Sequence, residues 1–514
     1  MMQVIKKDKE IANIYEQLNT LLGEVESFGQ SEKSVNQLER DILKRLLMIG
    51  LHLIILAVRN RHNSLERQGF ASGTSTMINK GINYRSYTSV FGTFDFPHRK
   101  YYIKGKGIYY PLDTSLSMPK GKLSYVLEDW LGKASTDLDY RESVRMLNEI
   151  LGLNLTGRQS KHQTDELGRQ VEEYYEQVPV TPVVLDHWLC LEWDGKGVPI
   201  IKEQRQGAAE QKKSKRPKAD LAATSVAARL KKGKKRGIKK TATVSVVSDF
   251  KPKERTKESI IRGLFKSPLS VVEAPKQKSD TCLDIEISTS NNWHQNIHRR
   301  AFMDNQQKAI KYGVQRAKRH SLDRPIPIVA LIDGGVGLEN QITTAFEQAG
   351  LSLQLRHIIL DIVHVSEYVW KAANAILGEN SKLRTNWVKE MLSDILDSKV
   401  AQVIKDLEAN RDKTQICSAA KQQLDKIITY FTNHQHKMDY KTYLEKGLPV
   451  STALVESSCG HLVKDRMERS GMRWSMQGAQ NMMDARAVKK NGDWNNFMEF
   501  FINKNQQAQQ KKAA

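Results

Sequence analysis

Three acidic residues lie where carboxylates could take part in catalysis. Asp194 and Asp333 each end a run of apolar residues and precede glycine, and Glu456 lies in a segment with helical spacing, VESSCGHLVKDRM. Carboxylates are good ligands for Mg²⁺, and two Mg²⁺ ions about 3.5–4 Å apart stabilise the attacking and leaving oxygens of an in-line phosphoryl displacement. Together these residues therefore indicate metal-dependent cleavage or joining of a phosphodiester.

Each of the three residues also has a plain structural explanation. An Asp-Gly pair after a strand usually forms a turn, and a glutamate in the first turn of a helix complements the helix dipole. Their order along the chain is more informative: a strand with Asp, further strands, a second strand with Asp, a helical segment, and a helix with Glu. Because this is the layout of a ribonuclease-H-like sheet, we expect the three carboxylates to converge.

The elements that must position these residues are predicted from apolar spacing. We predict a strand from Val183 that stops at Asp194 and a short strand, Ile326–Ile332, that stops at Asp333. The other predicted elements are strands at 241–250 and 351–360, a long polar helix at 293–320, helices after 338, throughout 362–445 and at 453–469.

The N-terminal third has a different character. We predict a helix at 34–60, β-hairpins with a small aromatic core at 80–112, and helices at 123–178. The last of these include a helix at 140–150, a turn at Gly152 and a second helix from the N-cap Thr156, which is typical of a helix-turn-helix. Its second helix would present Arg158 and Lys161 to DNA bases, although a solvated polar face explains them equally well.

The composition favours a polyanionic partner. The chain has 514 residues, and 80 Lys and Arg against 58 Asp and Glu give a net charge of +22. The basic segment 202–240, which contains Lys234, Lys235 and Arg236, is either a solvated loop or a contact to the phosphate backbone.

Membrane insertion and zinc binding are not expected. The longest apolar run, Leu46 to Val58, is shorter than the about 20 residues of a spanning helix, and no signal-peptide core precedes it. We therefore expect a cytoplasmic protein. The four cysteines form no CxxC pair, so we interpret them as reduced and structural.

Four blocks of the chain resemble the DDE transposases of bacterial insertion sequences, most closely the ISKra-type family, with a relation to the Mutator-like and hAT-like group. These blocks are WDGKGVPI, ALIDGGVGL, LDIVHVSEYVW and the long block from Gly447 to Ala487. The resemblance implies that Asp194, Asp333 and Glu456 are the catalytic, metal-holding triad. It also implies an all-helical insertion between the last two acids.

The resemblance gives roles to residues near the triad. Asp361 and His364 match a motif at the start of the insertion that positions DNA or shapes the active site, although a buried hydrogen-bonded pair is an equal alternative. Basic residues after Glu456 are expected to contact phosphates near the scissile bond: Lys464, Arg466, Arg469 and Arg473.

The sequence thus predicts an α/β protein with a ribonuclease-H-like core, an all-helical insertion, and a mainly helical N-terminal DNA-binding region with a small β element. The expected parts are 1–120, a helix-turn-helix-like region 121–182, the first part of the core 183–360, the insertion 361–446, and the last part of the core with a tail 447–514.

The expected activity is transposition: cleavage at the ends of a mobile element and strand transfer into target DNA, with two Mg²⁺ ions for which Mn²⁺ can substitute. The expected partners are double-stranded DNA, comprising terminal inverted repeats and target, and a second copy of the chain or a larger homo-oligomer. The alternatives are a metal-dependent nuclease without strand transfer and a non-catalytic DNA-binding protein derived from a transposase.

Overall fold

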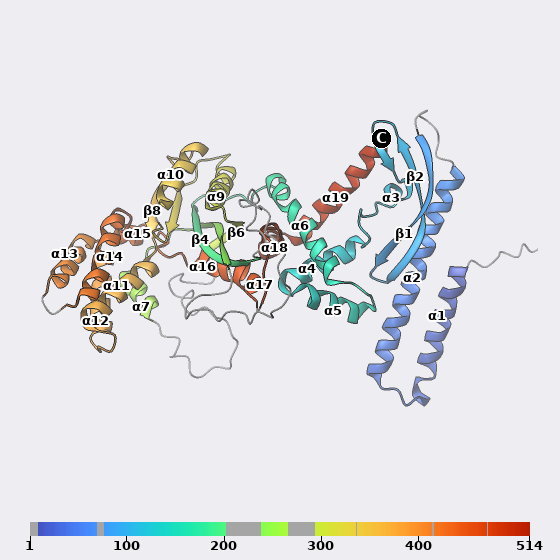
Figure 1. The fold of residues 1–514 in the computed structure, drawn as a ribbon, viewed down its shortest axis with the longest axis horizontal. Coiled ribbons are helices and arrows are strands. Elements are labelled where there is room, and N and C mark those ends of the chain that lie inside the picture. The colour runs from blue at the N-terminus through green and yellow to red at the C-terminus, as the bar shows by residue number, and fades with distance from the viewer. Residues whose placement is uncertain are drawn as a thin grey trace, which may run out of the picture. The chain divides into compact units, whose positions relative to one another are not determined.

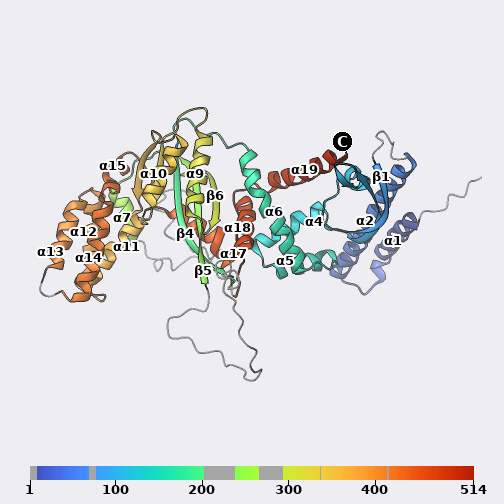
Figure 2. The same ribbon diagram turned by 45° about the horizontal axis from the view of Figure 1, so that its top comes forward.

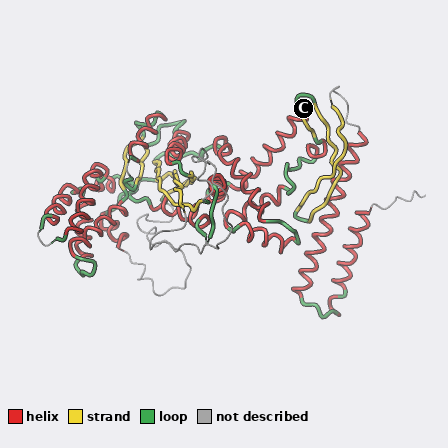
Figure 3. The backbone as a smooth tube through the Cα atoms, viewed as in Figure 1, coloured by secondary structure: helices red, strands yellow, loops and turns green. Residues whose placement is uncertain are grey.

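The chain forms two compact units in a computed structural model. Unit 1 comprises Met1–Glu176 and Gly492–Ala514, and unit 2 comprises Gln177–Asn491. Strands gather in two places, one sheet in each unit (Figure 3). The structure describes residues 9–68, 77–201, 238–265, 293–335, 337–413, 416–469 and 471–513.

Unit 1 begins with a helical hairpin and a small sheet. Helix α2 packs its apolar side chains, including Leu51 and Ile54, against Phe94 and Phe96 of the sheet. This confirms the predicted hairpins and their aromatic core. The elements are α1 (Lys9–Glu26), α2 (Val35–Gln68), and the antiparallel strands β1 (Met77–Ser89), β2 (Gly92–Ile103) and β3 (Gly107–Tyr109).

The predicted helix pair is also present in unit 1. Asp139 and Glu142 form a capping box at the start of α5, and Gly152 ends that helix in the left-handed conformation with φ 64°. The Thr156 hydroxyl accepts the Gln159 N–H at the start of α6. The helices of this part are α3 (Pro111–Ser115), α4 (Tyr125–Asp137), α5 (Tyr140–Leu151) and α6 (Gly157–Gln177).

The C-terminal helix α19 (Trp494–Ala513) belongs to unit 1, which corrects the expected single part 447–514. Its apolar side chains pack against α4 and α6. The Trp494 indole donates to Asp129 at 2.5 Å, and the Phe497 ring packs edge-on against Tyr174. Both ends of the chain therefore contribute to one unit.

Unit 2 is built on a mixed five-stranded sheet with the strand order β6-β5-β4-β7-β8. Strands β4, β5 and β6 are antiparallel neighbours, whereas β7 and β8 run parallel to β4. The strands are β4 (Trp188–Ile200), β5 (Ile238–Phe250), β6 (His294–Met303), β7 (Ile328–Ile332) and β8 (Leu355–Leu360).

The predicted polar helix at 293–320 is wrong in its first half. Residues His294–Met303 form strand β6, and only Gln306–His320 form a helix, α9. The strand was concealed because a charged residue on it is buried: Arg300 forms a 2.9 Å ion pair with Asp484. The Asn305 side chain accepts the Lys308 N–H and so begins α9.

Helices cover both faces of this sheet. Helix α9 contacts β4, β5 and β6 from one side (Figure 1). The elements that contact these strands from the other side are α16 (Ala453–Ser458), a π-helical turn (Cys459–Lys464) and α18 (Met476–Lys490), and α17 (Asp465–Met467) packs on the π-helical turn. Because side chains alternate along a strand, Trp193 packs toward α9, where its indole donates to the Ala309 carbonyl. Glu192 and Asp194 therefore face the α16 side.

An all-helical segment lies between β8 and α16, as predicted, and α10 (Leu338–Ala349) connects β7 to β8. The helices of the insertion gather at the β8 end of the sheet, and α7 (Lys257–Phe265) packs against them (Figure 2). The insertion helices are α11 (Ile362–Leu377), α12 (Arg384–Leu396), α13 (Val400–Arg411), α14 (Ser418–His434) and α15 (Tyr440–Glu445).

No helix among the described residues has the length and apolarity that crossing a membrane demands.

Replacing Phe497 by alanine should destabilise unit 1 selectively. The Phe497 side chain is 0% exposed, and removing a buried phenylalanine costs about 3–5 kcal/mol of stability. Hydrogen–deuterium exchange should accelerate in α4 and α6 and stay unchanged in β4–β8. The exposed neighbour substitution Asn496→Ala serves as the control. Equal acceleration in both units would contradict the assignment of α19 to unit 1.

Candidate active site

Asp194 lies in the middle of β4, not at its end. The prediction that the strand stops there was wrong because β4 continues to Ile200 in antiparallel pairing with β5. The parallel pairing with β7, however, ends at Glu192. Asp194 thus lies just beyond the point where β4 and β7 separate. Its side chain accepts the Gly195 N–H at 2.6 Å.

Asp333 directly follows β7, as predicted, and its carboxylate accepts the Gly335 N–H at 2.9 Å. Gly334 has φ 86°, and a Cβ there would lie 2.7 Å from the Tyr430 hydroxyl. That hydroxyl donates to the Asp333 carbonyl, and the Tyr430 ring stacks on Tyr368 at 3.9 Å. The insertion helices α11 and α14 therefore hold the turn that carries Asp333.

Glu456 lies in the first turn of α16, as predicted, and a buried glutamate on β4 fixes this turn. The Val455 N–H donates to Glu192 Oε2 at 2.9 Å, and Glu192 is 0% exposed. Sequence analysis missed Glu192. The available signal was an acidic residue inside an apolar strand, two positions before Asp194 and so on the same face.

Burial raises the pKa of Glu192 to about 8, against the opposing effect of the Val455 N–H. At neutral pH its carboxyl is therefore mostly protonated. A neutral carboxyl joins β4 to α16 without adding another negative charge beside Asp194 and Glu456. We interpret Glu192 as a positioning residue.

Asp361 and His364 form a hydrogen-bonded pair in which Asp361 is buried and His364 is partly exposed, so the expected buried pair is found only in part. Asp361 caps α11, where its carboxylate accepts the Val363 and His364 N–H groups, and it also accepts the Thr452 N–H at 3.2 Å. His364 Nδ1 lies 2.6 Å from Asp361 Oδ2 and 3.9 Å from Glu456 Oε1. The pair therefore connects the start of the insertion to the residues before α16.

The hydrogen bond to Asp361 raises the pKa of His364 to about 9, and the charges of Asp361, Glu456 and Asp333 add to the increase. Ligand atoms of Asp361, His364 and Glu456 all lie within 4.8 Å of one another, the spacing of a metal site. In the metal-free protein, the Asp361 oxygens accept N–H groups and His364 pairs with Asp361. We interpret this group as an ion-pair network beside the triad.

The triad residues share one electrostatic environment. Burial raises the pKa of Asp194, and the Asp333 carboxylate adds to the increase, whereas hydrogen bonds from the Cys459 thiol and the Gly195 N–H oppose it. Burial is the largest of these causes, so the raised pKa of Asp194 mainly reflects a desolvated carboxyl. Burial and the nearby Asp194 likewise raise the pKa of Cys459, so its thiol stays protonated.

This donor set fits divalent cations. Among the described residues, Asp194, Asp333 and Glu456 do not all approach within 4.8 Å of one another. A pair of ions about 3.5–4 Å apart, each with oxygen ligands at about 2.0–2.1 Å, spans up to about 8 Å, so outer ligands need not touch. A cation would also offset the charge of Asp333, which adds to the effect of burial on the pKa of Asp194.

The helix after Glu456 contains a π-helical turn, Cys459–Lys464, within the predicted helix 453–469. A buried arginine of α18, Arg486, donates to the carbonyls of Leu462 and His461 in this turn. Turns of this kind are frequent at functional sites because they redirect side chains. Here the turn begins at Cys459, whose thiol contacts Asp194.

The basic residues after Glu456 separate into two groups. Lys464, Arg469 and Arg473 are exposed, so contact with phosphates stays a prediction for them. Arg466 is 0% exposed and its guanidinium lies 5.0 Å from the Trp474 ring centroid. The expected phosphate contact of Arg466 is therefore wrong, because this side chain packs inside the unit beside a buried tryptophan.

The other expected DNA contacts lie elsewhere in the chain. Arg158 and Lys161 are exposed on the first turns of α6, and Lys161 pairs with Asp165 at 2.6 Å. The basic residues Lys234, Lys235 and Arg236 lie outside the described residues.

A scan against protein-family models and a search of curated proteins find no match. The functional argument therefore rests on the residues and their geometry.

The substitution Asp361→Asn should lower the pKa of His364 from about 9 toward its ordinary value in metal-free protein, because the main cause of the increase is lost. In the parent protein the ion pair stabilises the fold fully below the ordinary pKa of histidine, and this contribution is lost as the pH rises through about 9. The variant should lack this loss of stability.

Nuclear magnetic resonance titration of the His364 ring, with thermal unfolding measured over the same pH range, checks this prediction. Asp465→Asn, at an exposed carboxylate beside His461, is the matched control. An unchanged His364 titration in Asp361→Asn would show that the hydrogen bond is not the source of the shift.

Proposed function

We propose that the protein is a DDE transposase that cleaves the ends of a mobile element and joins them to target DNA. The observation that carries the proposal is that acids from distant parts of the chain act on the same part of β4. In addition to burial, the charge of Asp333 raises the pKa of Asp194, and the charges of Asp194 and Glu456 both raise the pKa of Cys459. Asp194 and Asp333 follow the end of the pairing between β4 and β7, and the bond between Glu192 and the Val455 N–H brings Glu456 to the same strand.

The arrangement of unit 2 supports a ribonuclease-H-like core. Its sheet has three antiparallel strands in sequence order, followed by two parallel strands added on the other side of the first. One acid lies on the first strand, the second follows the fourth, and the third lies on a helix after the last. This agrees with the layout expected from sequence.

Two Mg²⁺ ions, when bound, would supply charge stabilisation of the attacking and leaving oxygens in an in-line displacement. Asp194, Asp333 and Glu456 would hold them. His364, with its pKa raised to about 9, stays cationic at neutral pH and is suited to hold a phosphate near these acids. Asp361 and Glu192 position His364 and Glu456.

The chain's remaining charge suits a DNA substrate. The net charge is +22 although the centre is acidic, and exposed basic residues follow Glu456 on the same helix region: Lys464, Arg469 and Arg473. Cationic side chains there would bind the backbone of a duplex whose scissile phosphate reaches the acids. The helix pair α5–α6 is the proposed reader of element ends.

Substitution of Asp194, Asp333 or Glu456 by the matching amide should reduce cleavage of element-end DNA by about 100-fold or more, because a metal-holding carboxylate is lost. Binding of the end should be preserved. The assay uses a labelled end fragment and a plasmid target in Mg²⁺, with chelator and Mn²⁺ reactions alongside. Asp465→Asn, an exposed acid on the same helix region, is the control.

Each outcome of this assay has a clear meaning. Joined products that depend on all three acids support the transposase. Nicks without joined products would indicate a nuclease without strand transfer, and metal-independent binding without turnover would indicate a non-catalytic DNA-binding protein. Full cleavage by any of the three variants would remove that residue from the site.

A dimer or larger assembly is part of the proposal, since two element ends must be held together. Helix α1 offers a surface for a second copy: five apolar residues recur in alternating steps of four and three and are between 36% and 55% exposed. That 3.5-residue repeat is the pattern of a coiled-coil seam. The five are Ile11, Tyr15, Leu18, Leu22 and Val25.

Placing lysine at Leu18 and Leu22 together should dissociate the assembly, because two charges would enter an apolar seam. Light scattering of the full chain after size exclusion measures the mass. Asn19→Lys, an exposed position on the same helix outside the seam, should leave the mass unchanged. A double variant that keeps the parent's mass would rule out α1 as the interface.

A further inference from the structure

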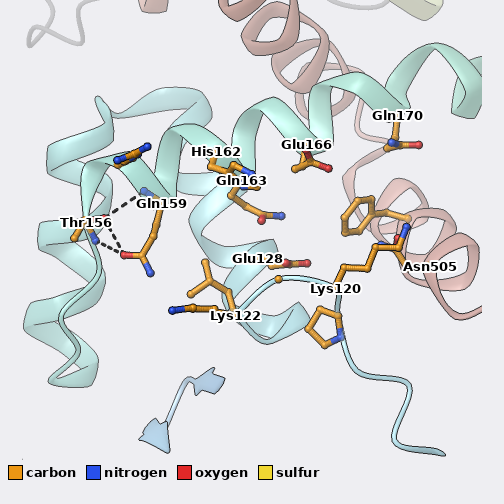
Figure 4. A pocket seen from close by; sticks show the side chains of 15 residues that line it. Lys120, Lys122, Glu128, Thr156, Gln159, His162, Gln163, Glu166, Gln170 and Asn505 are labelled. Carbon is orange, nitrogen blue, oxygen red and sulfur yellow. Dashed lines mark hydrogen bonds between the residues drawn. The ribbon is translucent and has the colours of Figure 1, made fainter. Parts of the chain in front are cut away.

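Unit 1 contains a cavity of about 580 Å³ that the proposed active site does not use. It lies between α4, α6, α19 and the segment before α4, with Glu128 on α4, Gln163 on α6 and Phe501 on α19 among its lining residues. Figure 4 shows Glu128 and Gln163 reaching the same space from two helices. The volume is within the range of about 300–1,000 Å³ typical of ligand pockets.

Two buried polar atoms in this cavity have no hydrogen-bond partner among the described residues. They are Glu128 Oε2 and Gln163 Nε2, and the two side chains belong to residues that are only 5% and 4% exposed. A buried polar group without a partner lowers the stability of a fold. Such groups are retained where a ligand completes their hydrogen bonds, so they indicate a built site.

The chemistry of these groups fits the edge of an unpaired nucleobase. Burial raises the pKa of Glu128 to about 8, with the charge of Glu166 adding to the increase. A protonated carboxyl donates and accepts at adjacent atoms, and the Gln163 amide donates beside it. Every nucleobase carries neighbouring donors and acceptors on its edge, and the Phe501 ring offers an apolar wall against which a base can stack.

The rim of the cavity fits the phosphate that accompanies such a base. Lys120, Lys122 and Arg158 line it, and all three are exposed. Arg158 lies in the first turn of α6, a helix of 21 residues whose N-terminus favours an anion. A cationic rim around a polar, partly apolar interior matches a nucleotide better than an uncharged heterocycle.

We propose that this cavity binds one unpaired nucleotide, with Glu128 and Gln163 on the base edge and Lys120, Lys122 and Arg158 at the phosphate. The inference rests on the proposed activity on DNA, which makes an unpaired base at an element end the expected source. A base paired within a duplex cannot present its pairing edge to Glu128, so the nucleotide must be extrahelical or at a single-stranded end.

Calorimetric titration of the full chain, without divalent metal, tests the site. The probes are the four deoxynucleoside 5′-monophosphates and deoxyribose 5-phosphate, which lacks the base. We expect one site per chain and at least about tenfold tighter binding of a nucleotide than of the sugar phosphate. Oligonucleotides with 2-aminopurine in a single-stranded overhang or inside the duplex distinguish a base in DNA from a free nucleotide, since a buried base changes its fluorescence.

The substitutions Glu128→Leu and Gln163→Leu should each weaken nucleotide binding at least tenfold without lowering the melting temperature, because neither atom has a partner to lose. Glu128→Gln should retain binding within about threefold. Glu149→Gln, at an exposed residue on α5 away from the cavity, is the matched control.

Equal binding of the sugar phosphate and the nucleotides, or no binding of either, would overturn the proposal. So would loss of binding in Glu128→Leu that is accompanied by a lowered melting temperature and is not rescued by Glu128→Gln. Binding of monophosphates but not of overhang oligonucleotides would overturn the DNA source. Because the readout needs neither Mg²⁺ nor cleavage, failure of the transposase proposal would be seen separately.

Discussion

The hydrogen bond between the Val455 amide and the buried Glu192 carboxyl links parts of the chain that are 263 residues apart. Helix α16 follows a long insertion, so its sequence alone gives it no fixed place beside β4. A protonated Glu192 can accept this bond inside the core without the cost of a buried charge. This contact holds the first turn of α16, which carries Glu456, against β4, the strand that carries Asp194.

The sequence predicted most elements of unit 2, including the place of Asp333 directly after β7, because a continuous apolar run followed by Asp-Gly is a strong signal. The catalytic role of the three acids stays a prediction. Prediction from sequence failed where tertiary contacts override local pattern. β4 continues past Asp194 because β5 pairs with it, and β6 resembled a helix because Arg300 is buried by Asp484. Arg466 looked like a phosphate ligand, since nothing local indicates that it packs beside Trp474. The role of Glu192 required the position of Val455, which no spacing rule provides.

Asp361 explains how a large helical insertion can lie between β8 and α16 without separating them. Its carboxylate accepts N–H groups from both the start of α11 and Thr452, just before α16. The Ile362 N–H also donates to the Val450 carbonyl. Entry and exit of the insertion therefore meet at one buried anion.

The packing of α19 against α4 and α6 determines when unit 1 can be completed during synthesis. The chain is synthesised at about 5–20 residues per second, so the first residues of unit 1 leave the ribosome long before Trp494 and Phe497 do. Unit 2 is continuous in sequence between its bounds, so it can form while unit 1 still lacks its last helix. A nascent chain would thus acquire its acidic centre before its N-terminal unit closes.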